Sequence, residues 1–140
     1  MIKDDLAAFF LFRKSAEAGN AAGMCHLGCM YDTGRGVTQD YAKAVNWYRK
    51  AAEAENADGM CYLGFMLYTG RGVPQDYAEA VEWYRKAAAA RKPVAMRNLG
   101  VMYEFGYGVT KDSTEAARWY RKAADAGDED AIKALKRMGK

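Results

Sequence analysis

Hydrophobic positions in this chain follow the period of an α-helix, stop at glycines, and resume, and this alternation recurs along its length. Between residues 21 and 31, small and apolar side chains recur at spacings that gather them on one side of a helix. This stripe comprises Ala21, Met24, Leu27, Gly28 and Tyr31. The spacing predicts a first helix, helix A, in each segment of this kind.

The residues after helix A predict a turn and then a second helix, helix B. Gly34 and Gly36 interrupt the helical pattern, and glycine tolerates the positive φ that a helix exit and a tight turn require. Asp40, Asp76 and Asp112 each stand where the N-cap of the next helix belongs. The expected inward stripe of the first helix B is Ala44, Trp47 or Tyr48, and Ala51.

The helix–turn–helix pattern repeats with a period of 36 residues. Residues 20–55 and 56–91 align without a gap and agree at most positions, and 92–127 is a third, more divergent copy. The ends fit half copies, a helix B in 4–19 and a helix A in 128–140. The whole chain, residues 1–140, is therefore expected to form one repeat domain.

A hairpin of two short helices cannot bury both of its apolar stripes alone, so successive hairpins are expected to stack into an α-solenoid. Gly28, Gly64 and Gly100 recur in helix A, where a missing side chain lets the two helices of a hairpin approach closely. Gly19 and Gly127 mark expected exits from helix B. The predicted fold class is all-α.

The recurring residues resemble the Sel-one-like repeat family. The resemblance rests on Leu-Gly with an aromatic residue after it, a Gly-x-Gly-Val loop, Asp-x-x-x-Ala, and Trp-Tyr-Arg-Lys-Ala-Ala, and it covers residues 4–138. It implies a tetratricopeptide-type, right-handed superhelix of 36-residue hairpins. It also implies adaptor or scaffold work, often in bacteria, with a protein or peptide partner held on the concave surface lined by helix A.

Helix A positions that face away from helix B are the expected partner-binding residues. They mix apolar anchors with charged groups that would fix the register of a bound peptide. The alternative for each one is a partly buried inner edge with no partner. The predicted binding residues are Cys25, Cys29, Asp32, Asp58, Cys61, Phe65, Tyr68, Arg97, Val101 and Glu104.

The three cysteines, with His26 beside one of them, raise the question of a metal site. His26 points about 100° around the helix from Cys25, and neighbouring helices stand about 10 Å apart, too far to share a zinc ion at about 2.3 Å. We therefore predict free thiols and no metal or other cofactor. The cysteine spacing also does not match the disulfide-stapled branch of the family that the sequence resembles.

The first helix carries an apolar residue where its counterparts are polar. Phe10 shares a repeat position with Asn46, Glu82 and Arg118, which should face water. Phe10, with Leu6, is predicted to pack on a second copy of the chain, which would make it a structural self-assembly element. The alternatives are a preceding hairpin of a longer array, or a local cap that buries both side chains.

Composition narrows the remaining classes. A net charge of +3, spread evenly, does not favour nucleic acid binding. The longest apolar run, Leu6 to Phe12, is far short of the ~20 residues that cross a bilayer. An odd number of cysteines tilts the expected compartment weakly towards the reducing cytoplasm, with a periplasmic or secreted location if an export signal was removed.

Catalysis is not expected. One histidine and two serines, Ser15 and Ser113, form no arrangement of nucleophile and base. Some relatives in the family are linked to β-lactam binding or hydrolysis, but neither serine begins a Ser-x-x-Lys motif. The predicted function is a non-enzymatic protein-interaction module, with self-assembly, or a piece of a longer array, as the alternative.

Overall fold

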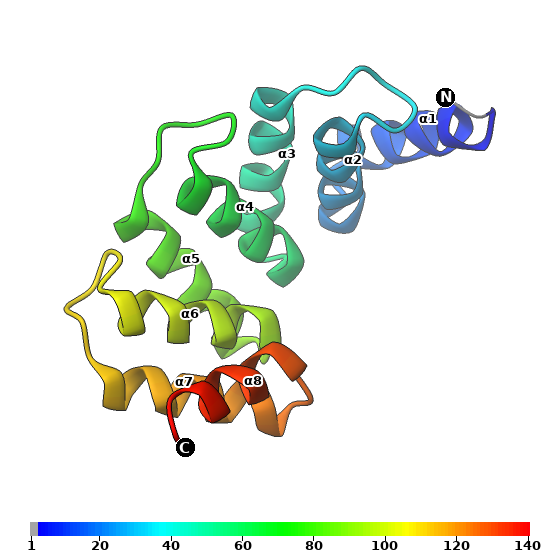
Figure 1. Ribbon diagram of the computed structural model, residues 1–140. Helices are drawn as coiled ribbons and strands as arrows, with labels where there is room; N and C mark the ends of the chain where they lie inside the picture. Colours follow the sequence, from blue (N-terminus) through cyan, green and yellow to red (C-terminus); the bar gives the residue numbers. More distant parts are fainter. Residues whose placement is uncertain (1–2) are drawn as a thin grey trace. The chain divides into compact units, whose positions relative to one another are not determined.

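The computed structural model describes residues 3–140, and within them the chain forms α-helices joined by short loops, with no β-strand (Figure 1). No helix in this range is long and apolar enough to span a membrane. The predicted all-α class is confirmed. The helices are α1 (Lys3–Glu17), α2 (Ala21–Thr33), α3 (Tyr41–Glu53), α4 (Ala57–Thr69), α5 (Tyr77–Ala89), α6 (Pro93–Phe105), α7 (Ser113–Asp125) and α8 (Glu129–Arg137).

The contacts between residues divide the chain into two compact units. Unit 1 ends at Gln75 and holds the helices α1 to α4, whereas unit 2 spans Asp76–Lys140 and holds α5 to α8. Within each unit every helix packs on the next one along the chain. The sequence pattern alone gives no sign of a boundary in the loop between α4 and α5.

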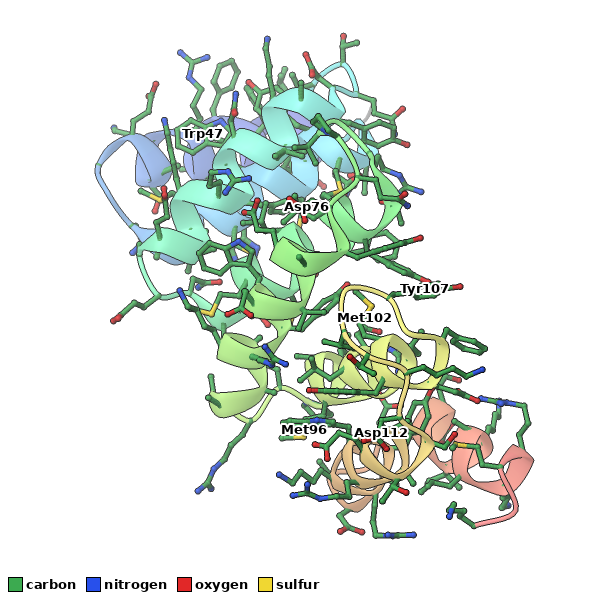
Figure 2. All side chains as sticks on the ribbon, turned by 90° about the vertical axis from the view of Figure 1, so that its left-hand side faces the viewer. Trp47, Asp76, Met96, Met102, Tyr107 and Asp112 are labelled. Carbon is green, nitrogen blue, oxygen red and sulfur yellow. The ribbon has the colours of Figure 1, made fainter. Side chains whose placement is uncertain are left out.

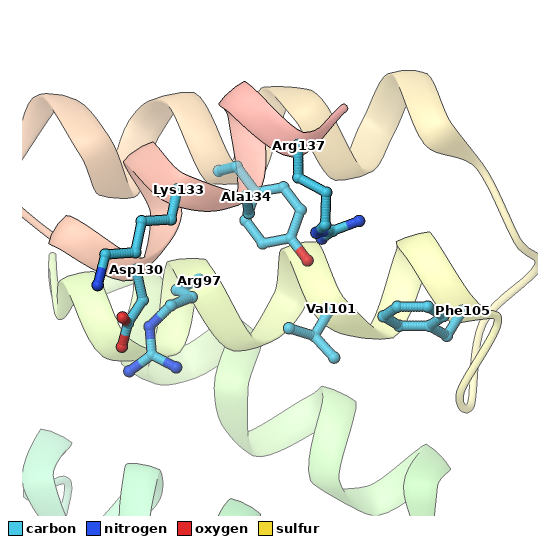
Figure 3. A pocket seen from close by; sticks show the side chains of 8 residues that line it. Arg97, Val101, Phe105, Asp130, Lys133, Ala134 and Arg137 are labelled. Atoms are coloured by element: carbon cyan, nitrogen blue, oxygen red, sulfur yellow. The ribbon is translucent and has the colours of Figure 1, made fainter. Parts of the chain in front are cut away.

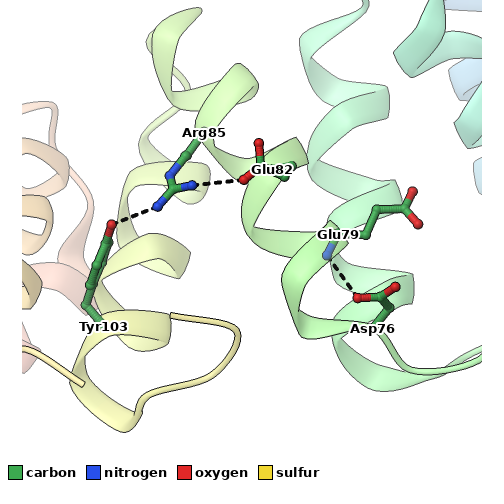
Figure 4. Close-up of polar contacts among 5 residues, drawn as sticks. All are labelled: Asp76, Glu79, Glu82, Arg85 and Tyr103. Carbon is green, nitrogen blue, oxygen red and sulfur yellow. Dashed lines mark hydrogen bonds and ion pairs between the residues drawn. The ribbon is translucent and has the colours of Figure 1, made fainter. Parts of the chain in front are cut away.

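Side-chain caps begin most of the helices. The N-caps predicted at Asp40, Asp76 and Asp112 are confirmed, because each carboxylate accepts a hydrogen bond from the backbone N–H three residues later. Figure 4 shows this bond at Asp76. Asn20 and Asn56 cap helices α2 and α4 in the same way, with oxygen–nitrogen distances of 2.8 Å. Local hydrogen bonding therefore fixes where both kinds of helix start.

Left-handed residues end each helix B. Gly19 and Gly127 have φ of +92° and +95° and confirm the predicted exits. Glu55 and Arg91 occupy the corresponding places in the two central copies, each with φ of +65°. A side chain makes this conformation unfavourable, so the backbone of the repeat is imposed there on residues that do not favour it.

The cores of the α2–α3 and α6–α7 hairpins are each built on a tyrosine packed against a glycine. Tyr48 and Tyr120 are buried, and a Cβ added at Gly28 or Gly100 would lie only 2.7 Å or 2.6 Å from their rings. The inward residue of helix B is thus the tyrosine rather than the preceding tryptophan. Trp47 is half-buried on α3, with the Lys50 ammonium 4.5 Å from the centre of its ring (Figure 2).

The glycine loops also touch the backbone of a preceding helix. A Cβ added at Gly72 would stand 2.5 Å from the carbonyl group of Tyr41, and one at Gly108 would stand 2.6 Å from the carbonyl oxygen of Tyr77. Both glycines have φ of +73°. The loop of one hairpin therefore rests directly on the main chain at the start of the previous helix B.

Candidate functional site

In unit 1 the predicted binding residues lie on α2 and α4, and they differ in exposure. Phe65 is 40% exposed and Asp58 is also exposed, whereas Cys25 is only 5% exposed. The other predicted residues of this unit are half-buried; they are Cys29, Asp32, Cys61 and Tyr68. We call this set, without Cys25, the helix-A face of unit 1.

Cys25 departs from the expectation that it lines an open surface. Its thiol lies close enough to Asp58 and Cys61 of α4 for their charges to raise its pKa. A helix A packed beside another helix A covers this position, and the helical period of α2 alone could not reveal that. Cys25 therefore lies beneath the helix-A face of unit 1 and is not part of it.

The Tyr48 hydroxyl joins α3 to α2 beneath this face. It donates towards Asp32, 3.0 Å from Oδ2, and lies 3.4 Å from Cys29 Sγ. The ring of Tyr62, from α4, stacks on the Tyr48 ring with centroids 5.0 Å apart and is itself 43% exposed. We call Cys25, Cys29, Tyr48 and Tyr62 the thiol–tyrosine cluster.

The hydrogen bonds of the thiol–tyrosine cluster lower the pKa of one thiol and raise the pKa of the other. The Cys25 thiol donates to Cys29, which lowers the pKa of Cys29 from 9.0 to about 6, with help from the hydroxyls of Tyr48 and Tyr62. The same bond, with burial, raises the pKa of Cys25. The charge on Cys29 and partial burial raise the pKa of Tyr62 to about 12. Both tyrosines stay protonated donors at neutral pH.

An arginine borders the apolar part of the unit 1 face. The Arg71 guanidinium lies 5.5 Å from the ring centre of Phe65 and 5.1 Å from that of Tyr41. Stacking of this kind leaves aromatic surface and a cation side by side. Phe65 thus presents an accessible apolar surface with charged groups at its edge.

In unit 2 the predicted residues Arg97 and Glu104 of α6 are held by ion pairs to the C-terminal segment. Arg97 Nε lies 3.1 Å from Asp128, the N-cap of α8. Glu104 accepts two hydrogen bonds from Arg137, of 2.6 Å and 2.8 Å, and one of 2.8 Å from the Tyr120 hydroxyl. These donors lower the pKa of Glu104.

A small open pocket of about 350 Å³ lies between α6 and α8 (Figure 3). Val101, the third predicted residue of unit 2, lines it between the two ion pairs. Phe105, which is 51% exposed, lines it as well and was not predicted. The full lining is Arg97, Val101, Phe105, Tyr120, Asp130, Lys133, Ala134 and Arg137.

Three further residues with ring contacts or hydrogen bonds described here were not predicted from the sequence, namely Tyr62, Arg85 and Arg137. Arg85 bonds both Glu82 and the hydroxyl of Tyr103, each at 2.9 Å (Figure 4). A signal for Arg137 was present in the sequence, since it shares a repeat position with Phe65 and Val101.

The described part of the chain does not bring together the side chains of a metal site. Within residues 3–140, no three histidine, cysteine or acidic side chains are placed to hold a metal ion. His26 is exposed, and its ring stacks on Phe12 with centroids 4.7 Å apart.

The residues predicted for self-association lie on α1. Leu6 and Phe10 are 42% and 55% exposed. These two side chains of α1 are therefore open to solvent.

Repeated hairpins with tyrosine-on-glycine cores define a tetratricopeptide-type repeat protein. The family model described as Sel1 repeat matches residues 1–20, 21–56, 57–91 and 93–128, so the chain belongs to the Sel1 repeat family. Sel1 repeat proteins are generally non-enzymatic scaffolds for protein interactions. No curated protein matches the chain.

Solved structures agree with this assignment. A Sel1 repeat protein from Oxalobacter formigenes is 37% identical, with a TM-score of 0.91 over 96% of this chain and 55% of its own. A protective antigen of uropathogenic Escherichia coli with an SLR fold is 41% identical, with a TM-score of 0.88 over 91% of this chain and 27% of its own. Helicobacter pylori cysteine rich protein B is 26% identical, with a TM-score of 0.68 over 89% of this chain and 94% of its own. The chain thus spans only part of the first two proteins.

Proposed function

We propose that this chain is a non-enzymatic adaptor that holds a peptide or a surface segment of a protein partner on its helix A residues, with Phe65 as the main anchor. The observation that carries the proposal is the 40% exposure of Phe65 on a face otherwise made of half-buried and charged side chains. Large aromatic residues at the centre of a patch commonly dominate binding energy.

Charged groups around this anchor supply the polar rim. Asp58 is exposed on α4, and Arg71 lies at the edge of the Phe65 ring. In unit 2, Val101 and the neighbouring Phe105 offer apolar contacts, while Arg97 and Glu104 are already engaged by α8. We therefore expect unit 1 to contribute more of the binding energy than unit 2.

The test compares Phe65→Ala with a matched exposed position on another helix, Leu11→Ala, which is 68% exposed on α1. A partner is captured from the native host, identified by mass spectrometry, purified, and titrated by calorimetry against each variant. Phe65→Ala is expected to weaken binding about ten-fold, which corresponds to about 1.4 kcal/mol, and Leu11→Ala to leave it unchanged. Equal affinities for wild type and Phe65→Ala would refute the proposal.

A second candidate function, self-assembly, is favoured by the apolar surface of α1. Phe10 is 55% exposed although it packs edge to face on the buried Phe9 ring, with centroids 5.9 Å apart. If copies associate through this helix, Phe10→Asp lowers the mass measured by light scattering, and Phe65→Ala does not. A monomeric wild-type mass at high concentration would dispose of this candidate.

A further inference from the structure

All three cysteines of the chain lie on two neighbouring helices of unit 1. Cys25 and Cys29 are one helical turn apart on α2, and Cys61 occupies on α4 the repeat position of Cys25. Cys25 is buried, whereas Cys29 is half-exposed and shares its repeat position with Phe65. Cys29 is thus the thiol of α2 that solvent reaches.

Hydrogen-bond donors from α2, α3 and α4 reach the Cys29 sulfur. They are the Cys25 thiol one turn earlier, the Tyr62 hydroxyl, and the Tyr48 hydroxyl at 3.4 Å, whose single proton is shared with Asp32 Oδ2 at 3.0 Å. The ring of Tyr62 stacks on that of Tyr48. Two donors and a shared third around one sulfur favour its thiolate over its thiol.

Two carboxylates face the same cluster and act in the opposite direction. The charge of Asp32 disfavours a thiolate at Cys29, and that of Asp58 disfavours one at Cys25. The hydrogen bonds outweigh this repulsion at Cys29, where the net pKa falls to about 6. At Cys25 repulsion adds to burial, so this thiol keeps its proton and remains a donor.

We propose that Cys29 is a nucleophilic thiol that forms a mixed disulfide with low-molecular-weight disulfides, while Cys25 and Tyr48 hold its thiolate in place. The Cys29 thiolate attacks one sulfur of the disulfide R–S–S–R. A Cys29–S–S–R bond forms, the S–S bond of the reagent breaks, and R–S⁻ leaves with the electron pair and takes a proton from water. Cys29 is oxidised and the released thiol is the reduced product, so no other oxidant is needed.

Cys25 does not displace the bound group within an intact helix. Side chains one turn apart have Cβ atoms about 5–6 Å from each other, whereas a disulfide needs about 3.5–4.5 Å. The mixed disulfide is therefore the expected end product until a free thiol reverses it. The proposal concerns the reactivity of Cys29 alone and does not depend on the partner-binding function.

The rate advantage of Cys29 over an ordinary thiol depends on pH. A lower pKa raises the thiolate fraction but reduces its intrinsic nucleophilicity, so the rate advantage over a thiol with a pKa of 9.0 is only about four-fold at pH 7. The advantage grows to about twenty-fold at pH 6, where an ordinary thiol is almost wholly protonated. The pH dependence therefore separates Cys29 from an ordinary thiol better than a rate at one pH.

The experiment measures the reaction of the full chain with 4,4′-dithiodipyridine from pH 5 to pH 9, with glutathione disulfide and peptide mass mapping to locate the adduct. We expect one fast thiol at Cys29 with a rate midpoint near pH 6. The fast phase should vanish in Cys29→Ser and persist in the matched control Cys61→Ser. Cys25→Ala and Tyr48→Phe should each move the midpoint to higher pH.

Two results would overturn the proposal. One is a wild-type midpoint near pH 9, and the other is an adduct that forms first at Cys61. Both can be read from the wild-type protein, so the test holds even if Cys25→Ala or Tyr48→Phe fails to fold. Circular dichroism identifies such variants before their rates are compared.

Discussion

Units 1 and 2 contain the same buried hydrogen bond and surround it with different chemistry. In unit 1 the Tyr48 hydroxyl lies 3.0 Å from the carboxylate of Asp32, and in unit 2 the Tyr120 hydroxyl lies 2.8 Å from that of Glu104. Thiols adjoin the bond in unit 1, whereas Arg137 adjoins it in unit 2. The two units thus share the bond because each has a carboxylate at this repeat position, and the neighbouring side chains decide what the surrounding surface can do.

The difference traces to two repeat positions. Arg97 of α6 corresponds to Cys25 of α2, and Arg137 of α8 corresponds to Phe65 of α4. Both arginines make ion pairs that link α6 to the C-terminal segment, and both line the small pocket between α6 and α8. Their counterparts in unit 1 are a buried thiol and an exposed aromatic ring. At these two positions unit 1 therefore has a thiol and an accessible aromatic ring where unit 2 has ion pairs.

The largest expected effect concerns the packing of a tyrosine ring on a glycine, which both units share. Gly28→Ala and Gly100→Ala each place a methyl group against a buried tyrosine ring, which has little room to move. We expect each change to destabilise its own unit by about 1–3 kcal/mol. Hydrogen exchange resolved by peptide measures the loss unit by unit. A tolerated alanine in only one of the two units would show that their cores are not equivalent.

An effect of intermediate size tests the ion pair found only in unit 2. Arg137 lowers the pKa of Glu104, so the pair stabilises the fold above the ordinary carboxyl value of 4.5, and this contribution is lost as the pH falls from 4.5 through the lowered pKa. We expect Arg137→Ala to lower the urea midpoint at pH 6 and to lower it less at pH 3. Arg118→Ala, which breaks an exposed pair with Glu115, is the matched control. An equal loss for Arg137→Ala at both pH values would contradict the prediction.

The smallest expected effect comes from giving unit 1 a side chain that unit 2 has at the same repeat position. Phe65→Arg gives unit 1 the residue that unit 2 has at position 137, and Arg71→Tyr, made together with it, removes the cation that would repel the new arginine. The introduced guanidinium is expected to pair with Asp32 and to stabilise the fold by about 0.5 kcal/mol. A double-mutant cycle with Asp32→Asn measures this coupling, and a value of zero would show that α4 and α2 do not repeat the geometry of α8 and α6.

Most of the fold could be predicted because its determinants are local. The helical spacing, the aspartate caps and the exits at Gly19 and Gly127 each depend on a few adjacent residues. Glu55 and Arg91 could not be recognised as left-handed from their identities, because residues with a side chain rarely adopt a positive φ. The division into two units depends on contacts between helices, which no short motif records.

The candidate site was less predictable because it depends on how neighbouring helices face each other. The helical period placed Phe65 on an accessible face, but it also placed Cys25 there, which α4 covers. The pair of Glu104 and Arg137 joins residues 33 positions apart on two helices that are not consecutive in the chain. Side-chain lengths and helix orientation together decide such contacts, and a single sequence gives only the first.

The contact of each glycine loop with an earlier main chain limits how this architecture can change in length. Gly72 packs on the backbone of Tyr41, and Gly108 packs on that of Tyr77. A residue inserted into either loop would therefore break this contact and displace the helix that follows the loop. Whole hairpins can be duplicated or lost without disturbing these contacts. Gene-level variation in such proteins should therefore arrive in complete modules of 36 residues, and shorter insertions should be confined to places where no loop makes such a contact.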